Sequence, residues 1–594
     1  MISYQLMIAF LLISLLVHVY GNLISASRNA LESKHKSSCQ VCDCVGLTAD
    51  CSSRNIASLP QELPRDITVL RLYNNCITHL PDGLLGQLYQ NLEVLDIDLN
   101  KIAIFGNHTF TGLGNLQYLM IGHNPFKPER FHKLVYKPLE NIHTIQVNGM
   151  GDESKLDSRI ALFDAFEGLQ NSTIEAIIYK QITLMPFVLE NKHLRYFKHC
   201  HLKKMVLAEK GIFAIEPGFS HNVPQLEMID LSSNILRGRF PGTNIFFDIY
   251  LMRYLRVVKI EGNSNVLFKR NNIIVPFSKK MSENEWAVPA GLVEVHLRQT
   301  TVDIAPYHLP FGVKLQHNNK IKIIEASASF VTTYIGGALK GLVNLERFVY
   351  SDNDCIFAPE FFTCETGYFE SLQYLDLANN RAILHSSNSS STIFKNCSKQ
   401  RLIDVSYNDI TDIDAKAFVD TTGLEILNLS GNKIKQIVII LTQLKSLRIL
   451  NISNNHINTI EENKRKEIDE LIKTSSRNLT IDIRHNPLIC NCDSFKLIDW
   501  TQTHSDNIYK WQEVTCIHIN GSEVAINDIL LPGMKWDCWK AMIIPPVVSF
   551  GLVVLGSVLV ICIYRRRYKI HYLALLIRAL LRRHQQVDFQ FDFD

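Results

Sequence analysis

The chain repeats one arrangement of apolar and polar positions along most of its length. An apolar residue is followed by two variable residues, an apolar one, a variable one, an apolar one, two variable ones and then an asparagine. Clear copies run from Leu92 to Asn100, Leu226 to Asn234, Leu372 to Asn380, Leu424 to Asn432 and Leu447 to Asn455. The central alternation sends apolar side chains to one face and variable ones to the other, so each copy predicts a short β-strand.

The spacing of the copies predicts how these strands stack. Weaker copies end at Asn75, Asn124, Asn263, Asn353, Asn408 and Asn486. Where the run is unbroken, neighbouring copies lie mostly 23 to 29 residues apart, which is the period of leucine-rich repeats. One repeat cannot bury its own apolar face, whereas a stack buries a continuous core. The pattern predicts an α/β leucine-rich-repeat solenoid over residues 67–486. We expect a curved horseshoe with a parallel concave sheet and about seventeen repeats.

The middle of the solenoid is predicted to be irregular. Between Pro125 and Gln225 the asparagine is lost, and residues 142–147 and 174–177 are degenerate copies. Residues 264–290 form a long stretch between two strand patterns, and this stretch carries Lys269, Arg270, Lys279 and Lys280. The simpler interpretation is a solvated loop on the convex side. The alternative is a ligand or dimer contact, because long insertions often carry function.

Two apolar segments frame the chain. The first, Leu6 to Val19, has the length of the apolar part of a signal peptide, although no Lys or Arg precedes it; we expect residues 1–21 to be removed. The second, residues 542–564, is uncharged and long enough to cross a membrane. The arginines that follow it predict that residues 565–594 lie in the cytoplasm. The two segments together predict a single-pass type I topology.

Eight of the fourteen cysteines lie in two groups at the ends of the predicted solenoid. Cys39, Cys42, Cys44 and Cys51 precede the first repeat, and Cys490, Cys492, Cys516 and Cys538 follow the last. A CxxC pair is also found in zinc sites, but an even number of cysteines in a secreted chain favours disulfides. Spacing leaves three connectivities open for each group of four. We interpret residues 39–66 and 487–541 as caps on the solenoid.

The run from Asn486 to Cys492 resembles the C-terminal cap of leucine-rich-repeat proteins. This resemblance implies the pairs Cys490–Cys516 and Cys492–Cys538. Similarity to the N-terminal cap implies Cys39–Cys44 and Cys42–Cys51. We further expect Cys355 and Cys364 to close a loop within one repeat, whereas Cys76, Cys200 and Cys397 have no predicted partner.

Eight sequons for N-glycosylation indicate a domain that faces the secretory lumen. They lie at Asn107, Asn171, Asn388, Asn396, Asn428, Asn451, Asn478 and Asn520. Asn428 and Asn451 occupy the variable position between the inward apolar residues, so both side chains are expected on the concave face. Glycans there would move ligand contact toward the lateral edges or toward the N-terminal and central repeats.

Charge and motifs argue against catalysis and against a nucleic-acid-binding protein of high net charge. The net charge is +3, and residues 565–594 contribute seven Lys/Arg and three Asp, so the remainder carries about −1. There is no HExxH, GxSxG, phosphate-binding loop or dinucleotide fingerprint. We therefore expect no enzyme activity, no cofactor and no metal.

The cytoplasmic tail resembles a specific receptor family. The segment from Tyr564 to Ala579 is similar to the juxtamembrane segment of Toll-like receptors, and the last residues, 589–594, resemble the start of their TIR domain. The resemblance covers Cys39 to Asp594. It implies an innate immune receptor that binds a microbial or endogenous ligand of unknown class. It also implies a homodimer or a heterodimer with another Toll-like receptor, in the plasma membrane or an endosomal membrane.

Signalling in this family requires a TIR domain beyond the juxtamembrane tail. That domain recruits TIR-containing adaptors, and the 30 residues of 565–594 are too few to form one. The chain is then either the front part of a signalling receptor or a TIR-less decoy or co-receptor. A leucine-rich-repeat adhesion protein is the other alternative, but only Trp539 to Ala541 separate Cys538 from the predicted span, which favours the Toll-like interpretation. The basic tail is also expected to contact anionic membrane lipid.

Overall fold

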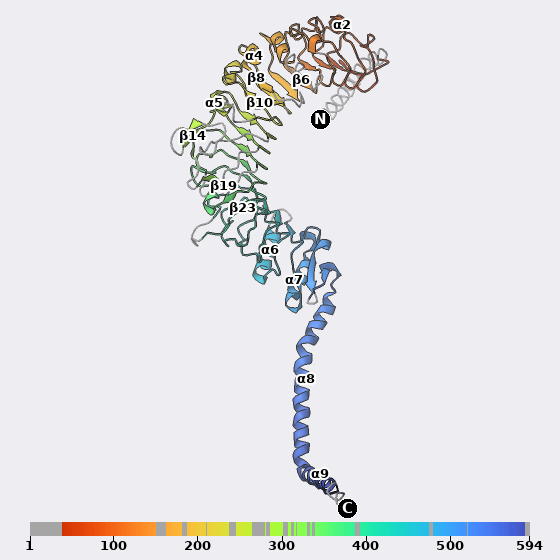
Figure 1. Cartoon of the computed structure of the whole chain (residues 1–594), viewed down its shortest axis with the longest axis vertical. Helices are drawn as coiled ribbons and strands as arrows, with labels where there is room; N and C mark the ends of the chain where they lie inside the picture. The colour runs from red at the N-terminus through yellow and green to blue at the C-terminus, as the bar shows by residue number, and fades with distance from the viewer. Residues whose placement is uncertain are drawn as a thin grey trace, which may run out of the picture.

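The computed structural model describes most of the chain between Cys39 and Val587. The described ranges are 39–126, 128–149, 162–180, 187–209, 211–236, 245–263, 279–280, 285–300, 307–309, 314–316, 318–329, 333–335, 339–386, 393–474, 479–518 and 521–587. The predicted signal peptide, residues 1–21, lies outside them. The chain forms a long curved solenoid, and one extended helix leaves its C-terminal end (Figure 1).

An 18-stranded sheet lines the concave side of the solenoid. Apart from the antiparallel pair β1–β2, each strand pairs in parallel with the strand of the next repeat, as Leu95 does with Leu119. The strands are β1 (Asp43–Val45), β2 (Thr48–Asp50), β3 (Val69–Arg71), β4 (Val94–Asp96), β5 (Tyr118–Met120), β6 (Thr144–Asn148), β7 (Ala176–Lys180), β9 (Lys204–Ala208), β11 (Met228–Asp230), β12 (Val257–Lys259), β15 (Glu294–His296), β18 (Ile323–Glu325), β20 (Arg347–Val349), β22 (Tyr374–Asp376), β24 (Leu402–Asp404), β25 (Ile426–Asn428), β26 (Ile449–Asn451) and β27 (Thr480–Asp482). The predicted leucine-rich-repeat solenoid with a parallel concave sheet is confirmed.

The repeated asparagines form a buried ladder beneath this sheet. Asn100 is typical: its Nδ2 donates to the carbonyls of Leu72 (2.9 Å) and Ile97 (3.1 Å), and its Oδ1 accepts from the Ile77 amide (3.1 Å). Ten more asparagines are buried in the same way: Asn75, Asn124, Asn234, Asn263, Asn353, Asn380, Asn408, Asn432, Asn455 and Asn486. Each bridges two successive turns where the backbone leaves its strand. An amide, with both donors and an acceptor, is the side chain that this position requires.

Aromatic packing replaces the ladder in the irregular stretch. The two degenerate copies still form strands, β6 and β7, which have five residues each. Tyr136 and Tyr179 are fully buried with their hydroxyls 3.2 Å apart. The Phe166 ring lies 5.2 Å from Tyr179 and 4.8 Å from Phe197. The stack therefore stays continuous where the asparagine is missing.

Short elements cover the other faces of the solenoid. The parallel strands β16 (Tyr307–Leu309), β19 (Thr333–Ile335), β21 (Ile356–Phe357) and β23 (Arg381–Ala382) form one small sheet, and β8 (Phe187–Leu189) pairs with β10 (Ile212–Ile215). A third sheet joins β13 (Lys279–Lys280), β14 (Glu285–Ala287) and β17 (Lys314–Leu315). Described helices on these faces include α2 (Leu84–Leu88), α4 (Asn191–Leu194), α5 (Ile245–Leu251) and α6 (Glu462–Thr474). Figure 1 shows them along the outer side of the curve.

Disulfides close both ends of the solenoid. The N-terminal end has Cys39–Cys44 and Cys42–Cys51. The C-terminal cap contains α7 (Phe495–Thr503) and the sheet of β28 (Ile489–Cys490), β29 (Thr515–His518) and β30 (Glu523–Ala525). It is held by Cys490–Cys516 and Cys492–Cys538. These four pairs are those that the family resemblance implies.

The predicted bridge between Cys355 and Cys364 is wrong. Cys364 pairs instead with Cys397, and their Cα atoms lie 5.0 Å apart. The two residues occupy equivalent places on successive turns of the solenoid, where the Cys364 amide donates to the Lys395 carbonyl at 2.9 Å. Cys355 is buried immediately before β21, and its amide donates to the ladder residue Asn380. Stacking therefore brings together cysteines one repeat apart, and not two within one repeat.

A single long helix connects the C-terminal cap to the tail. α8 (Leu531–Arg565) is the one helix in the described part of the chain that is long and apolar enough to cross a membrane. It begins inside the cap and contains Cys538, so the cap disulfide fixes its first turns. The predicted boundary at residue 542 is thus not a break in structure. α9 (Arg567–Val587) follows directly and leaves α8 at an angle (Figure 1).

Candidate functional site

The concave surface is built from the variable positions of the repeats. At the end of many strands an aspartate or asparagine accepts a hydrogen bond from the backbone amide two residues later, which fixes the turn out of the sheet. This occurs at Asp50, Asp96, Asp230, Asp376, Asp404, Asn428, Asn451 and Asp482. Their side chains share one row across the sheet. His296 and Glu325 occupy the same row in the central repeats.

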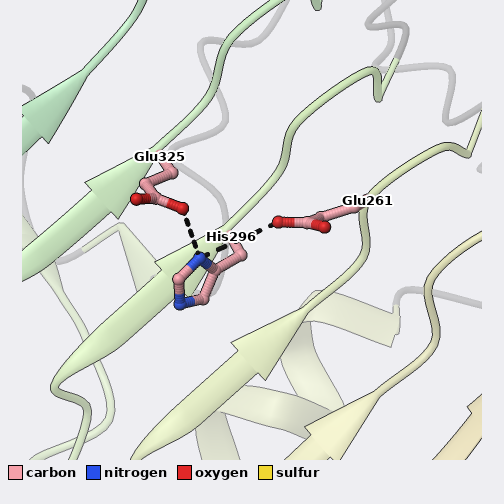
Figure 2. Close-up of side chains that lie close together, drawn as sticks. All are labelled: Glu261, His296 and Glu325. Atoms are coloured by element: carbon pink, nitrogen blue, oxygen red, sulfur yellow. Dashed lines mark hydrogen bonds and ion pairs between the residues drawn. The ribbon is translucent and has the colours of Figure 1, made fainter. Parts of the chain in front are cut away.

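A cluster of ionisable side chains converges on His296. Its Nδ1 lies 2.8 Å from Glu325 Oε2 and 3.8 Å from Glu261 Oε1 (Figure 2). Its Nε2 lies 3.3 Å from Glu294 Oε2. Glu261 follows β12, Glu294 and His296 belong to β15, and Glu325 ends β18, so three adjacent repeats contribute. The imidazole is 11% exposed, whereas the carboxylates are about a third exposed.

Arg347 on the next strand, β20, orients the cluster from one side. Its Nε lies 2.9 Å from Glu325 Oε1, and its guanidinium carbon lies 3.8 Å from the centre of the Tyr374 ring. Burial alone would raise the pKa of Glu325. The hydrogen bonds from His296 and Arg347 outweigh burial, so this pKa lies below its usual value.

Among the residues that the structure describes, the carboxylates around His296 outnumber the cations that pair with them. Three carboxylates surround the imidazole, and Arg347 contacts only one of them. Lys259 is the partner of His296 in strand register, and Arg298 lies two residues after His296 in the sequence. Within the described ranges, neither cation forms an ion pair with these carboxylates. Glu261, His296 and Glu325 each present one ligand atom, and these atoms lie within 4.8 Å of one another. The cluster can therefore attract and hold a cation.

Sequence reasoning missed this cluster. Its members stand at variable positions of three repeats, and the insertion at 264–290 interrupts the period between the first two. Only the alignment of β12, β15 and β18 in register would have placed them side by side. Of the four predicted ligand-contact residues, Lys279 and Lys280 form β13, which belongs to a different sheet, and Lys269 and Arg270 lie outside the described residues.

The sequons divide between the concave face and exposed turns. Asn428 and Asn451 are direct partners in the register of β25 and β26, and both are half-buried on the concave sheet. Asn107, Asn171 and Asn396 lie in exposed turns. The remaining three, Asn388, Asn478 and Asn520, lie outside the described residues.

We expect glycans on both Asn428 and Asn451. Each Oδ1 accepts from its sequon serine, and the Asn428 Nδ2 also donates to Asp404 at 2.7 Å. Paired strands lie about 4.8 Å apart, so the two sugars would cover the same patch of the concave face. Glycopeptide mass spectrometry of the chain from mammalian cells tests this, with Asn107 as the exposed reference. If both asparagines are bare while Asn107 is occupied, the prediction fails and the amides serve only their turns.

The stability of the fold is expected to depend on pH through Asp376, which lies on the same concave surface. Burial, with the nearby charges of Asp404 and Asp352, raises its pKa. Because the pKa of Asp376 is higher in the folded state than in the unfolded state, its ionisation at neutral pH destabilises the fold. This cost decreases as the pH falls below the folded-state pKa, and it is gone below the unfolded-state pKa. Asp376→Asn keeps the acceptor for the Ala378 amide. It should raise the thermal midpoint by about 1–2 °C at pH 7 and by nothing near pH 3.

The matched control for Asp376 is Asp230→Asn. Asp230 occupies the same row and makes the same turn, but its partners in register are Val206 and Lys259, which carry no negative charge. A thermal scan of both variants at the two pH values separates the effects. An equal gain in Asp230→Asn would show that charge repulsion at Asp376 is not the cause.

The stacked parallel strands, the asparagine ladder and the disulfide caps define a leucine-rich-repeat solenoid protein. The family model described as leucine rich repeat matches residues 65–126, 370–434 and 401–457.

Comparisons with whole proteins point to one group of receptors. The chain is 23% identical over 540 residues to Toll-like receptor 4 of Pinctada imbricata, a match that covers 85% of this chain and 58% of that receptor. It is also 23% identical over 500 residues to the CD180 antigen of Mus musculus, covering 78% of this chain and 68% of that protein. Among solved structures, the mouse RP105/MD-1 complex overlaps with a TM-score of 0.39 at 13% identity, covering 81% of this chain and 98% of that one. The two sequence matches confirm the predicted resemblance to Toll-like receptors.

Proposed function

We propose that the protein is a Toll-like innate immune receptor that binds its ligand with the leucine-rich-repeat horseshoe and acts without catalysis. The proposal is supported by a fold that continues without a break from the N-terminal cap to the apolar helix α8, together with sequence similarity to a Toll-like receptor. One sheet runs from the N-terminal cap to β27, the C-terminal cap follows, and α8 leaves that cap as an apolar helix. Similarity to Toll-like receptor 4 extends over 85% of the chain.

The proposed assembly is a pair of horseshoes held side by side by a ligand. The partner is a second copy of the chain or another Toll-like receptor, and adaptors with TIR domains join only where a TIR domain follows residue 594. A decoy or co-receptor works through the same pairing. Asn428 and Asn451, if glycosylated, leave the N-terminal and central repeats and the lateral edges for contact.

The experiment is a reporter chimera. A TIR domain is fused after Asp594, and cells carrying a TIR-dependent reporter are exposed separately to microbial lipid, protein, glycan and nucleic-acid preparations. We expect at least one class to activate the reporter. The control fuses the same TIR domain to α8 and α9 alone. Silence with every class, together with aggregation of cells that express the full chain, would favour a leucine-rich-repeat adhesion protein.

We propose a type I orientation in the plasma membrane or an endosomal membrane, with α9 lying on the cytoplasmic lipid surface. Leu573, Leu576, Ile577 and Leu580 are exposed and gather on one side of this helix, while Arg578 and Arg582 lie on the other. Such a helix places its apolar side among the lipid headgroups and its basic side toward anionic lipid.

This helix is expected to respond to lipid charge. In nanodiscs with phosphatidylserine, the α9 amides of the full chain should exchange hydrogen more slowly than in pure phosphatidylcholine. The variant R578E/R582E should lose that difference, since each basic residue near an anionic surface contributes about 1 kcal/mol. Equal exchange in both lipids would contradict the proposed contact.

A further inference from the structure

The geometry points to a metal site on the concave face: we propose that Glu261, His296 and Glu325 bind one divalent transition-metal ion, with Zn²⁺ the best match. The three side chains come from three successive turns, and the carboxylates of Glu261 and Glu325 both face Nδ1 of His296. The site consists of the chain's own residues and does not depend on which ligand the receptor binds.

The ligand atoms lie close to the arrangement that zinc requires. Zinc binds imidazole nitrogen and carboxylate oxygen at about 2.0–2.2 Å, usually with tetrahedral geometry, which separates the ligand atoms by about 3.3–3.5 Å. Here the Nδ1 atom of His296 lies 2.8 Å from Glu325 Oε2 and 3.8 Å from Glu261 Oε1. All three ligand atoms lie within 4.8 Å of one another. Side-chain adjustments of a few tenths of an ångström to about one ångström would therefore complete the site.

The other ring nitrogen of His296, Nε2, has the hydrogen-bond acceptor that a metal-bound histidine requires. The Nε2 of a histidine that binds metal through Nδ1 must carry the proton, and such histidines donate that proton to a carboxylate or carbonyl. Glu294 Oε2 lies 3.3 Å from His296 Nε2 and provides this acceptor. Glu294 stands two residues before His296 on the same strand, so β15 holds the ligand and its orienting carboxylate together.

One carboxylate ligand is oriented in the same manner. Arg347 Nε donates to Glu325 Oε1 at 2.9 Å, which leaves Oε2 directed at His296. The guanidinium is in turn placed over the Tyr374 ring. Hydrogen bonds to ligating carboxylates are a regular part of metal sites. The positive charge of Arg347 weakens metal binding, but it neutralises only one of the three carboxylates.

A bound metal explains the cluster better than a proton on His296. A proton on Nδ1 satisfies Glu325 at 2.8 Å but leaves Glu261 at 3.8 Å, outside hydrogen-bond distance. A metal ion engages both oxygens at once and brings two positive charges to a group of three carboxylates. Lys259 and Arg298 flank the site, and in the described residues they form no ion pair with it. A water molecule would supply the fourth ligand of a tetrahedral ion.

The test measures metal binding to the full chain in detergent after treatment with a chelator. Calorimetric titration with ZnCl₂ should show one site per chain that is lost in His296→Gln. Glu261→Gln and Glu325→Gln should each weaken that site by at least tenfold. Glu294→Gln should weaken it about tenfold while keeping the stoichiometry, as substitutions of orienting residues do. Glu227→Gln is the matched control, because Glu227 lies near the neighbouring strand β11 and pairs with Arg256.

A spectroscopic measurement on the unaltered chain keeps the proposal testable if a variant does not fold. Co²⁺ in place of zinc should give the visible bands of a four-coordinate nitrogen and oxygen site without sulfur charge transfer, and adding Zn²⁺ should remove them. Bands of a thiolate site would assign the metal to cysteines and overturn the proposal. It would equally be overturned if folded His296→Gln bound zinc as the unaltered chain does, or if the unaltered chain bound none.

Discussion

Replacing Asn432 with alanine is expected to lower the free energy of unfolding of the C-terminal repeats by about 3 kcal/mol. Asn432 is buried, and its Oδ1 accepts from the amides of Asn408 (2.9 Å) and Ile410 (3.0 Å). Its Nδ2 donates to the carbonyls of Val405 (3.0 Å) and Leu429 (2.9 Å). Alanine removes all of these bonds and leaves buried backbone groups without partners, each at a cost of about 1–3 kcal/mol.

Denaturant unfolding and cell-surface delivery both measure this effect. Asn432→Ala should shift the midpoint for the C-terminal repeats to lower denaturant and should reduce the fraction of chain that leaves the endoplasmic reticulum. Asn115→Ala is the control, because Asn115 is exposed and makes one bond of 3.3 Å to the Gln90 carbonyl. If the two variants behave alike, the ladder does not hold the repeats together.

Removing the Cys364–Cys397 disulfide is expected to cost about 3 kcal/mol. The bond closes a loop with a sequence separation of 33 residues, and a loop of this length loses a substantial chain entropy on closure in the unfolded state. The double variant C364S/C397S should therefore melt well below the unaltered chain under oxidising conditions. Under reducing conditions the difference should shrink.

Peptide mapping without reduction distinguishes this pairing from the intra-repeat alternative. A linked peptide containing Cys364 and Cys397 is expected, and it should persist in Cys355→Ala. A linked peptide of Cys355 and Cys364 would instead show that the stacking of these two turns is misassigned.

The fold could be predicted from the sequence because the repeat imposes it locally. The apolar positions of Leu92 to Asn100 already define an inward face, a strand and a buried amide. The same pattern placed Asn428 and Asn451 at the variable position between the inward residues, where β25 and β26 now have them. The cap disulfides, in contrast, came from resemblance, because four cysteines alone leave the pairing open.

The contacts between repeats could not be predicted, since they depend on how turns of unequal length stack. Cys364 meets Cys397 because both lie at one height on successive turns, a fact that the sequence separation does not reveal. His296 meets Glu261 across the insertion at 264–290 for the same reason. The sequence-based expectation of no metal rested on motifs that are contiguous in the chain, whereas this cluster is assembled across strands.

Energy transfer between two full chains measures whether the horseshoes bind a ligand and pair in the membrane. Chains carrying donor and acceptor fluorophores after Asp594 are expressed together and exposed in turn to microbial lipid, protein, glycan and nucleic acid. If a ligand brings two horseshoes together, transfer should rise with at least one of these classes, and excess unlabelled chain should reverse the rise. Unchanged transfer with all four classes, in cells whose chains are shown to be at the surface, would contradict this pairing.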